Sequence, residues 1–436
     1  MNIPEILLVE SEHKPGSLAK ILAAIGEAGG LVDHLNMVRR EQGKTVWEIT
    51  VEGDETIHRA VESKINALTN ARLMGRSDRV FTRHEGGKIR MISRLPLVSQ
   101  QELRDIYTPG VARVCMAIHK DPSLAWRYTY LSNAVAIVTN GTRVLGLGNI
   151  GPLASLPVME GKAALFARFV DISAVPILLE ETDPARIVEI VMAISPSFGA
   201  IQLEDISSPA CFEIEEQLRK RLDKPVLHDD QHGTAVVALA ALLNVMQRLK
   251  RDLRTCVVGQ LGFGAAGFGI ARLLSSYGVG RLMGADLNTE ALSRVSTLGG
   301  EPSTLEEVMR TADVVIATTG RAGLIKPEMV RPGQVILALT NPAPEITPQV
   351  ALSKGASFAA DGGSVNNMLG YPGLFRGALN ARAKHFTDDM LLAASRKLAE
   401  LAQGDELLPT VLDRNMHAQV AQAVYEAAIA NPLAVS

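Results

Sequence analysis

Two hydrophobic patterns alternate along the first 81 residues. Short runs of alternating apolar and polar residues predict strands at 5–11, 32–40, 45–53 and 71–81. Apolar positions three and four apart predict helices at 15–30 and 54–68. With a turn at Gln42 and Gly43, the order is β-α-β-β-α-β, which is typical of a ferredoxin-like module. Residues 84–88, "HEGGK", read as the linker that follows this module.

From residue 89 to residue 240, short apolar runs end in polar residues. These runs are "AVAIVTNG" at 134–141, "VPILLE" at 175–180 and "GAIQLED" at 199–205. Continuous apolar runs of this length predict strands that are buried on both faces, and parallel sheets place functional groups at the carboxyl ends of such strands. We therefore expect an α/β domain here.

A glycine-rich turn marks the third region. In "VVGQLGFGAAGFGIARLL", a buried strand leads into Gly262, Gly264 and Gly267, which have G-x-G-x-x-G spacing, and a helix follows. A second strand then ends at Asp286. In this order the spacing predicts a Rossmann-type dinucleotide-binding domain, because glycine lets the backbone approach a pyrophosphate at the helix N-terminus. We expect the whole turn to bind the cofactor: Gly262, Phe263, Gly264, Ala265, Ala266 and Gly267.

Asp286 bears on the choice of cofactor. A carboxylate at this position accepts hydrogen bonds from the adenosine ribose and repels a 2′-phosphate. The following "LNTEAL" supplies no arginine or lysine, so NAD is favoured over NADP, although NADP stays possible. The alternative interpretation is a loop acid that caps the next helix.

Length and composition define the class of protein. A chain of 436 residues suggests several domains, which we place at 1–83, 89–240 and 241–400, with C-terminal helices at 401–436 that pack back on the second. A net charge of −3 gives no reason to expect nucleic acid or a membrane as a partner. Three cysteines without a C-x-x-C pattern, an acidic N-terminus and the lack of a long apolar segment indicate a cytoplasmic protein.

The stretch "HDDQHGTA", residues 228–235, resembles the H-E-x-x-H pattern of zinc peptidases. That pattern needs both histidines on one helix face. Here a short strand leads into the stretch and Thr234 is a plausible N-cap, so we expect His228 and His232 to precede the helix. A zinc peptidase is therefore disfavoured.

Two pairs of acids follow predicted strands: Glu204 with Asp205, and Asp229 with Asp230. Adjacent carboxylates repel each other and are costly to bury unless a cation joins them. Oxygen ligands of this kind suit Mg²⁺ or Mn²⁺ rather than zinc. The alternative is that these acids only favour the starts of helices.

Lys162 and Tyr107 are candidates for proton transfer. Lys162 follows a glycine and leads into an apolar helix, and a lysine near a helix N-terminus is a candidate for a lowered pKa. Tyr107 opens "YTPGVA", where a Pro-Gly turn can present the phenol to a cleft. Their ordinary roles would be a solvent-facing lysine and a packing residue.

Several long stretches together closely resemble the malic enzyme family. They are "YTPGVA", "VTNGTRVLGLGNIG", "LPVMEGKAALF", "QLEDISSPACFEIE", "KPVLHDDQHGTAVVALAALLN", "TNPAPEI" and "VNNMLGYPGLFRGAL". They run in the family's order over roughly residues 90 to 385, which is most of the chain. The implied reaction is the oxidative decarboxylation of (S)-malate to pyruvate and CO₂, with reduction of NAD(P) and a divalent metal ion.

The resemblance implies a role for each matched position. Tyr107 matches the general acid, Lys162 the base that takes the hydroxyl proton, and Asp229 the residue that pairs with this lysine. The implied metal ligands are Glu204, Asp205 and Asp230, which leaves His228 and His232 to support the turn.

Further positions match substrate and nicotinamide contacts. Arg143 fits an arginine that holds a substrate carboxylate in some relatives. Asn341 of "TNP" matches a contact to cofactor and substrate, and Asn366 and Asn367 of "VNN" match substrate contacts.

The N-terminal module resembles an ACT domain, with "HKPGSL" at the first strand-to-helix turn. ACT domains commonly pair side by side and bind small effectors, so the resemblance implies a homodimer or higher even oligomer and an effector such as an amino acid. A module used only for dimerisation is the alternative. Two rivals to the whole interpretation are a metal-independent hydroxyacid or amino-acid dehydrogenase, and a non-catalytic effector-binding protein on a dehydrogenase scaffold.

Overall fold

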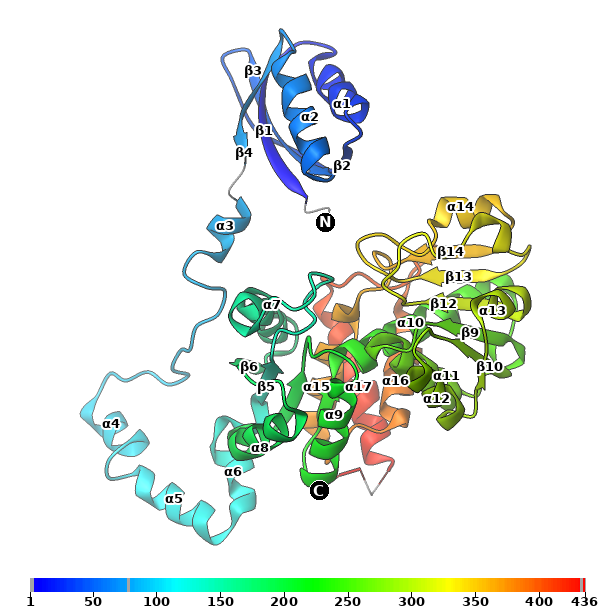
Figure 1. Ribbon diagram of the computed structural model, residues 1–436. Helices are drawn as coiled ribbons and strands as arrows, with labels where there is room; N and C mark the ends of the chain where they lie inside the picture. Colours follow the sequence, from blue (N-terminus) through cyan, green and yellow to red (C-terminus); the bar gives the residue numbers. More distant parts are fainter. Residues whose placement is uncertain (1–3, 77–78, 432–433, 436) are drawn as a thin grey trace. The chain divides into compact units, whose positions relative to one another are not determined.

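The computed structural model describes residues 4–76, 79–431 and 434–435. The chain forms two compact units, residues 1–88 and 89–436 (Figure 1). In the described residues, no helix combines the length and the apolar character that crossing a membrane requires.

The first unit is a four-stranded antiparallel sheet with two helices, in strand order β2-β3-β1-β4. Its elements up to β4 follow the expected order: β1 (Glu5–Glu12), α1 (Ser17–Glu27), β2 (Leu31–Glu41), β3 (Lys44–Glu52), α2 (Glu55–Asn66) and β4 (Ala71–Arg76). A short helix that was not expected, α3 (Arg79–His84), comes after them. Aliphatic side chains of both helices and of the central strands form one core, including Ile21, Ile25, Ile49 and Val61. Gln42 and Gly43 have positive φ angles at the turn between β2 and β3.

The last strand of this unit is shorter than expected. We predicted a strand at 71–81, but β4 ends at Arg76 and residues 79–84 are helical. Arg76 pairs with Leu7, and β1 begins only two residues before Leu7. A longer β4 would therefore have almost no partner. Residues 77 and 78 lie outside the described residues.

The second unit contains two parallel sheets. The first has strand order β6-β5-β7-β8, and its strands are β5 (Ala134–Thr139), β6 (Ser173–Leu178), β7 (Ala200–Leu203) and β8 (Val226–His228). The larger helices around these strands are α7 (Pro152–Val170), α8 (Pro184–Ile194), α9 (Ala210–Arg221) and α10 (Asp229–Leu249). Before the sheet come α4 (Gln100–Ile106), α5 (Val111–Lys120), η1 (Pro122–Leu124), α6 (Ala125–Tyr128) and η2 (Tyr130–Asn133); η3 (Ser195–Ser197) precedes β7.

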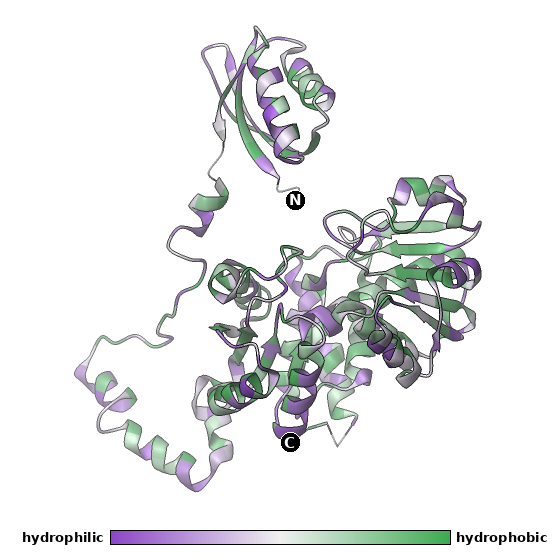
Figure 2. Ribbon diagram, viewed as in Figure 1, coloured by the Kyte–Doolittle hydropathy of each residue, from purple (hydrophilic) through white to green (hydrophobic). Residues whose placement is uncertain are grey.

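The second sheet has six parallel strands in the order β11-β10-β9-β12-β13-β14. The strands are β9 (Val257–Leu261), β10 (Arg281–Ala285), β11 (Glu301–Pro302), β12 (Val314–Ala317), β13 (Val335–Ala338) and β14 (Phe358–Asp361). Associated helices are η4 (Leu253–Thr255), α11 (Ala265–Tyr277), α12 (Thr289–Thr297), α13 (Leu305–Thr311), η5 (Pro327–Met329) and α14 (Pro348–Ser353). The order reverses between β9 and β12, which is where such sheets bind dinucleotides. Strands β12 and β13 are entirely apolar and buried (Figure 2), as expected for strands that are covered on both faces.

One continuous core joins the two sheets. Helix α10 is almost entirely buried and packs against α11. The C-terminal helices complete this core: η6 (Asn367–Leu369), α15 (Tyr371–Ala381), α16 (Asp388–Leu401) and α17 (Arg414–Ile429). Helix α17 reaches back to α7, where His417 stacks on Phe169 with ring centroids 4.4 Å apart.

Candidate functional site

Two neighbouring strands bring the four acids together. Strand β7 runs directly into Glu204 and Asp205, and β8 runs into Asp229 and Asp230. Leu203 pairs with His228 in parallel register, so both acid pairs leave the sheet at the same edge. The sequence pattern placed these acids at strand ends, and the fold makes those ends adjacent.

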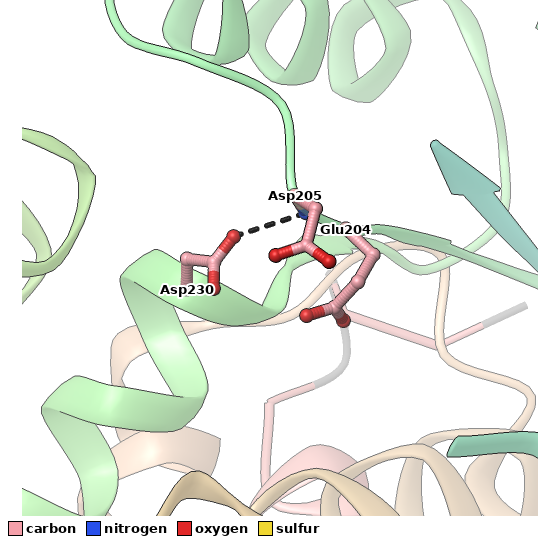
Figure 3. A group of neighbouring side chains, drawn as sticks. All are labelled: Glu204, Asp205 and Asp230. Carbon is pink, nitrogen blue, oxygen red and sulfur yellow. Dashed lines mark hydrogen bonds between the residues drawn. The ribbon is translucent and has the colours of Figure 1, made fainter. Parts of the chain in front are cut away.

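Three of these carboxylates form a candidate metal site. Glu204, Asp205 and Asp230 each offer an oxygen, and the three oxygens lie within 4.8 Å of one another (Figure 3). The backbone N–H of Asp205 donates to Asp230 Oδ2 at 3.1 Å, which fixes the turn after β7 to the start of α10. Asp205 Oδ2 is buried, and no group in the described residues hydrogen-bonds it.

Burial disfavours the charged form of these carboxylates unless positive charge is supplied nearby. It raises the pKa of Asp205 to about 7, and the neighbouring Asp230 carboxylate adds to the effect. Burial also raises the pKa of Glu204 well above its usual range, against the opposing effect of Lys162. A divalent cation would remove the cost of this buried negative charge.

Lys162 supplies the nearest positive charge. Its Nζ lies 2.6 Å from Asp229 Oδ2 and 2.8 Å from Glu204 Oε1. Burial alone would lower the pKa of this amine, but the carboxylates of Asp229 and Glu204 outweigh burial and raise it well above its ordinary value.

Two expectations about Lys162 were wrong. The residue lies in the middle of α7 rather than near its N-terminus, because the helix begins at Pro152. The pKa is raised rather than lowered, since two carboxylates contact the amine where the sequence suggested only a helix dipole.

Tyr371 is a site residue that the sequence reasoning missed. The Lys162 Nζ lies 4.8 Å from the centroid of its ring, in a cation–π contact. The ring is fully buried and packs edge-on against Phe166. Burial raises the pKa of the Tyr371 phenol, and within the described part of the chain its oxygen has no hydrogen-bond partner. The signal for it was the hydrophobic "LGYPGLF" stretch, which reads equally well as ordinary core.

Helix α10 begins earlier than expected. We predicted Thr234 as its N-cap, but the helix starts at Asp229 with His228 at the N-cap position. The prediction that both histidines precede the helix was therefore wrong for His232. Two acids in the first turn interact favourably with the helix dipole, which explains how "DDQHG" becomes helical.

Glu215 of α9 hydrogen-bonds the turn that contains both histidines. Its carboxylate accepts the backbone N–H of His228 at 2.9 Å, and it lies 2.9 Å from His232 Nε2. It also accepts from Gln231 Nε2 at 3.2 Å. Although burial alone would raise its pKa, the charge and hydrogen bond of His232 lower the pKa of Glu215 to about 2. This buried acid holds the turn that presents Asp229 and Asp230.

The glycine-rich turn has the form that a dinucleotide requires. Gly262 has a φ of +85°, and a Cβ there would lie 2.8 Å from Thr318 O. A Cβ at Gly267 would lie 1.9 Å from Gly262 O, so the turn and α11 approach too closely for any side chain. Asp286 accepts the Phe263 N–H at 2.6 Å and the Asn288 N–H at 2.8 Å. Asp286 therefore orders the turn, while Asn288 is the N-cap of α12.

The predicted substrate residues fall into two groups. Asn367 donates to Asp229 Oδ2 at 3.0 Å and is part of the cluster. The backbone N–H of Arg143 donates to Asp205 O at 3.0 Å, which connects Arg143 to the cluster. The Arg143 side chain is exposed. Asn366 is exposed and caps η6 by accepting the Met368 N–H. Asn341 is exposed after β13, beside Gly362.

Tyr107 is not brought to the cluster. Its side chain is 67% exposed, at the C-cap of α4. Among the described residues, no hydrogen bond or ion pair links it to Lys162 or to the acids. Helices α4 and α5 contain no buried residue.

A dinucleotide turn on a parallel sheet, beside a buried lysine–carboxylate cluster, defines an oxidoreductase. Sequence comparison identifies its family. Residues 87–219 match the malic enzyme N-terminal domain, and residues 287–429 match the malic enzyme NAD binding domain. The chain is 49% identical over 426 residues to NAD-dependent malic enzyme 1 of Bacillus subtilis, covering 97% of each chain. The chain therefore belongs to the malic enzyme family, as its sequence motifs indicated.

Two further proteins to which the chain is similar are also malic enzymes. NAD-dependent malic enzyme of Geobacillus stearothermophilus is 40% identical over 442 residues, covering 94% of this chain and 91% of the relative. The crystal structure of malic enzyme from Pyrococcus horikoshii is similar with a TM-score of 0.77 and 40% identity, covering 82% of this chain and 91% of that one.

Proposed function

We propose that the chain catalyses the oxidative decarboxylation of (S)-malate to pyruvate and CO₂, with NAD⁺ as the hydride acceptor and a divalent cation. The observation that carries this proposal is the buried cluster of Lys162, Asp229 and the three-carboxylate site at one sheet edge. Membership of the malic enzyme family and high identity to NAD-dependent relatives support it.

Glu204, Asp205 and Asp230 would hold the cation. Their oxygen-only donor set fits Mg²⁺ or Mn²⁺, and the unpartnered buried Asp205 Oδ2 is an atom that a cation would satisfy. When bound, the cation supplies Lewis acidity, which stabilises negative charge on the 2-keto oxygen as CO₂ leaves.

Lys162 is the base that accepts the proton of the malate C2 hydroxyl while C2 transfers hydride to the nicotinamide. To do so the amine must be neutral. Glu204 contacts the lysine and also belongs to the cation site. Cation binding at Glu204 would withdraw part of the negative charge that holds the Lys162 pKa up. Asp229 then remains to orient the amine.

The glycine-rich turn from Gly262 to Gly267 receives the NAD pyrophosphate at the N-terminus of α11. Asp286 lies beside it and disfavours a 2′-phosphate by charge repulsion. Asn341, Arg143, Asn366 and Asn367 supply the contacts to nicotinamide and substrate.

Tyr107 acts as the general acid that protonates C3 of enolpyruvate, and it does so in the site of a second copy of the chain. The segment around it is apolar and exposed: Leu97 is 55% exposed, Val98 82%, Leu103 50% and Met116 54%. Apolar surface of this extent, on α4 and α5 and on the stretch just before them, favours a protein partner. A second copy that binds this segment would explain why these helices are exposed and why Tyr107 does not reach the Lys162 cluster of its own chain. The enzyme is then a homodimer or a higher even oligomer.

The N-terminal unit is an ACT-like regulatory module that binds a small effector, such as an amino acid. Its β-α-β-β-α-β order and its sheet support this assignment. The exposed edge strand β2, with Leu31 69% and Met37 51% exposed, offers a surface for pairing of two modules.

One assay tests the activity. Purified protein is incubated with malate and either NAD⁺ or NADP⁺, with and without Mn²⁺, and both reduced cofactor and pyruvate are measured. We expect equal amounts of NADH and pyruvate, only with Mn²⁺, and less product with NADP⁺. Reduced cofactor without metal or pyruvate would instead indicate a metal-independent dehydrogenase. No reaction in any combination would contradict catalysis of malate decarboxylation.

A further inference from the structure

Glu345 is a buried carboxylate that the proposed chemistry does not use. It is 0% exposed, and in the described part of the chain no ion pair reaches it. Its Oε1 accepts the Thr319 N–H at 2.7 Å, the Thr319 hydroxyl at 2.7 Å and the Thr340 hydroxyl at 2.6 Å. Its Oε2 accepts the Thr340 N–H at 3.3 Å. Burying a carboxylate without a cation is costly, and these four hydrogen bonds offset that cost.

The hydrogen bonds join two loops at the carboxyl edge of the dinucleotide sheet. Thr319 follows β12 and Thr340 follows β13, which are parallel neighbours. Because both hydroxyls donate to Glu345, their lone pairs are free to accept further bonds. Thr340 Oγ1 accepts the Gly320 N–H at 2.9 Å, and Thr319 Oγ1 accepts the Arg321 N–H at 3.2 Å. Glu345 thus orients three successive backbone N–H groups after β12: that of Thr319 directly, and those of Gly320 and Arg321 through the threonine hydroxyls.

These loops lie next to the glycine-rich turn and to Asn341. A Cβ at Gly262 would lie 3.1 Å from the Thr319 Cα, so the turn and the first loop are in contact. Asn341 directly follows Thr340, and a Cβ at Gly362 would lie 2.7 Å from Asn341 Nδ2. A shift of the Thr319 and Thr340 loops would therefore move both the turn and Asn341.

We propose that Glu345 is a positioning residue for the cofactor: its carboxylate holds the loops after β12 and β13 in the arrangement that receives the nicotinamide half of NAD. The inference rests on the proposed binding of NAD at the Gly262 turn. The Glu345 carboxylate hydrogen-bonds Thr319 and Thr340, so it would act on the cofactor through these two residues. Loss of the carboxylate should accordingly weaken cofactor binding and leave the metal site intact.

The test uses full-length variants with complementary defects. Glu345→Ala removes all four hydrogen bonds, Glu345→Gln can keep the oxygen that accepts three of them, and Thr340→Val removes one hydroxyl with little change of shape. Glu328→Ala is the matched control, because Glu328 is an exposed glutamate of η5 in the same sheet domain. NADH affinity is measured by fluorescence titration, Mn²⁺ affinity by electron paramagnetic resonance, and folding by thermal unfolding.

Two reactions distinguish a defect in cofactor binding from a defect in the metal site. Malate oxidation requires NAD⁺. Decarboxylation of added oxaloacetate breaks the C3–C4 bond, adds a proton at C3 and yields pyruvate and CO₂, so it consumes no dinucleotide. For Glu345→Ala we expect NADH affinity and malate oxidation to fall about tenfold or more, the factor for a lost charge-assisted hydrogen bond. Mn²⁺ affinity and Mn²⁺-dependent oxaloacetate decarboxylation should stay within about twofold of wild type. Glu345→Gln and Thr340→Val should show the same pattern more weakly, and Glu328→Ala none of it.

Unchanged NADH affinity in folded Glu345→Ala and Thr340→Val would overturn the assignment. So would equal losses of NADH affinity, Mn²⁺ affinity and oxaloacetate decarboxylation, since they indicate a general structural role. If Glu345→Ala does not fold, Thr340→Val decides by the same measurements. Wild-type protein that neither binds NADH nor forms it from malate would contradict the proposed function itself, and the assignment with it.

Discussion

The amine of Lys162 lies 2.6 Å from Asp229 Oδ2, so the candidate base and its orienting acid form a buried ion pair across two elements, α7 and the first turn of α10. In Lys162→Met the side chain keeps its shape up to Cε and loses the amine that accepts the proton. We expect kcat for malate oxidation to fall by about 10²–10⁴, the usual contribution of a general base. Steady-state kinetics with saturating Mn²⁺ and NAD⁺ measure the change.

A second, partly buried lysine is the control for Lys162. Lys224 donates to the backbone oxygens of Ser195 and Phe198, away from the acids. Lys224→Met should lower thermal stability and change kcat by less than about threefold. A comparable loss of kcat in both variants would show that burial, and not proton transfer, explains the effect at Lys162.

Asp230 belongs to the proposed cation site and comes from α10, whereas the other two acids follow β7. Asp230→Asn preserves the shape of the side chain and removes its charge. We expect Mn²⁺ affinity to fall by about a hundredfold, with NADH affinity unchanged. Electron paramagnetic resonance of free Mn²⁺ measures the first quantity and fluorescence titration the second. Asp183→Asn, which alters only a helix cap at Ala185, is the control. Equal Mn²⁺ binding by both variants would rule out Asp230 as a ligand.

Glu215 supports this site without belonging to it. Replacing it with Gln leaves the shape of the side chain and weakens its bonds to the His228 amide and to His232. We expect a roughly tenfold loss of Mn²⁺ affinity, because supporting hydrogen bonds around metal ligands commonly contribute that much. The neighbouring Glu216 is exposed and pairs with Lys220, so Glu216→Gln should have no effect. Identical affinities in the two variants would contradict a supporting role for Glu215.

A mixing experiment tests whether Tyr107 serves a second copy. Tyr107→Phe and Lys162→Met are each expected to be inactive alone. If one chain supplies the tyrosine and the other the lysine, a mixed dimer has one intact site. Co-expression should then restore about a quarter of wild-type activity, since about half of the dimers are mixed. Activity no greater than that of the separate variants would show that each chain uses its own Tyr107.

The sequence predicted the parts of the site that local patterns encode. Buried strands ending in acids indicated Glu204 and Asp230 as candidate ligands, and glycine spacing indicated a dinucleotide turn, because both patterns depend on a strand and the few residues after it. The start of α10 was misplaced, since acids and Gly233 in "DDQHG" resemble a loop until the helix dipole is considered. The helix around Lys162 was likewise placed too late, because Gly161 resembled its beginning.

The supporting residues could not be read from local pattern in the same way. Glu215 lies in "FEIEEQLRK" among other acids, and only its position on the face shared with Cys211, Ile214 and Leu218 marks it as buried. Glu345 depends on two loops that the sheet brings together from separate stretches of chain. Such roles follow from tertiary packing, which the spacing of residues along one element does not report.

His417 provides a test of pH-dependent stability away from the site. Burial lowers its pKa, although Val411 O and Asp413 oppose the shift, and its ring stacks on Phe169. A histidine whose folded-state pKa is lowered stabilises the fold fully above its unfolded pKa of about 6.5. Below that pH the unfolded chain binds a proton that the folded chain does not, so stability falls as the pH decreases. Asp205, whose folded-state pKa burial raises to about 7, has the opposite effect in this pH range, so the test is the difference between variants. We expect the thermal midpoint of His417→Gln, which can still donate to Val411 O, to rise relative to that of wild type as the pH falls from about 7.5 to 5.5. His385, whose pKa burial also lowers, is present in both proteins and keeps its share of the slope of the midpoint against pH. His34→Gln, at an exposed position in the other unit, is the control and should leave the slope of the midpoint against pH unchanged. An unchanged slope in His417→Gln as well would show that His417 is not the responsible group.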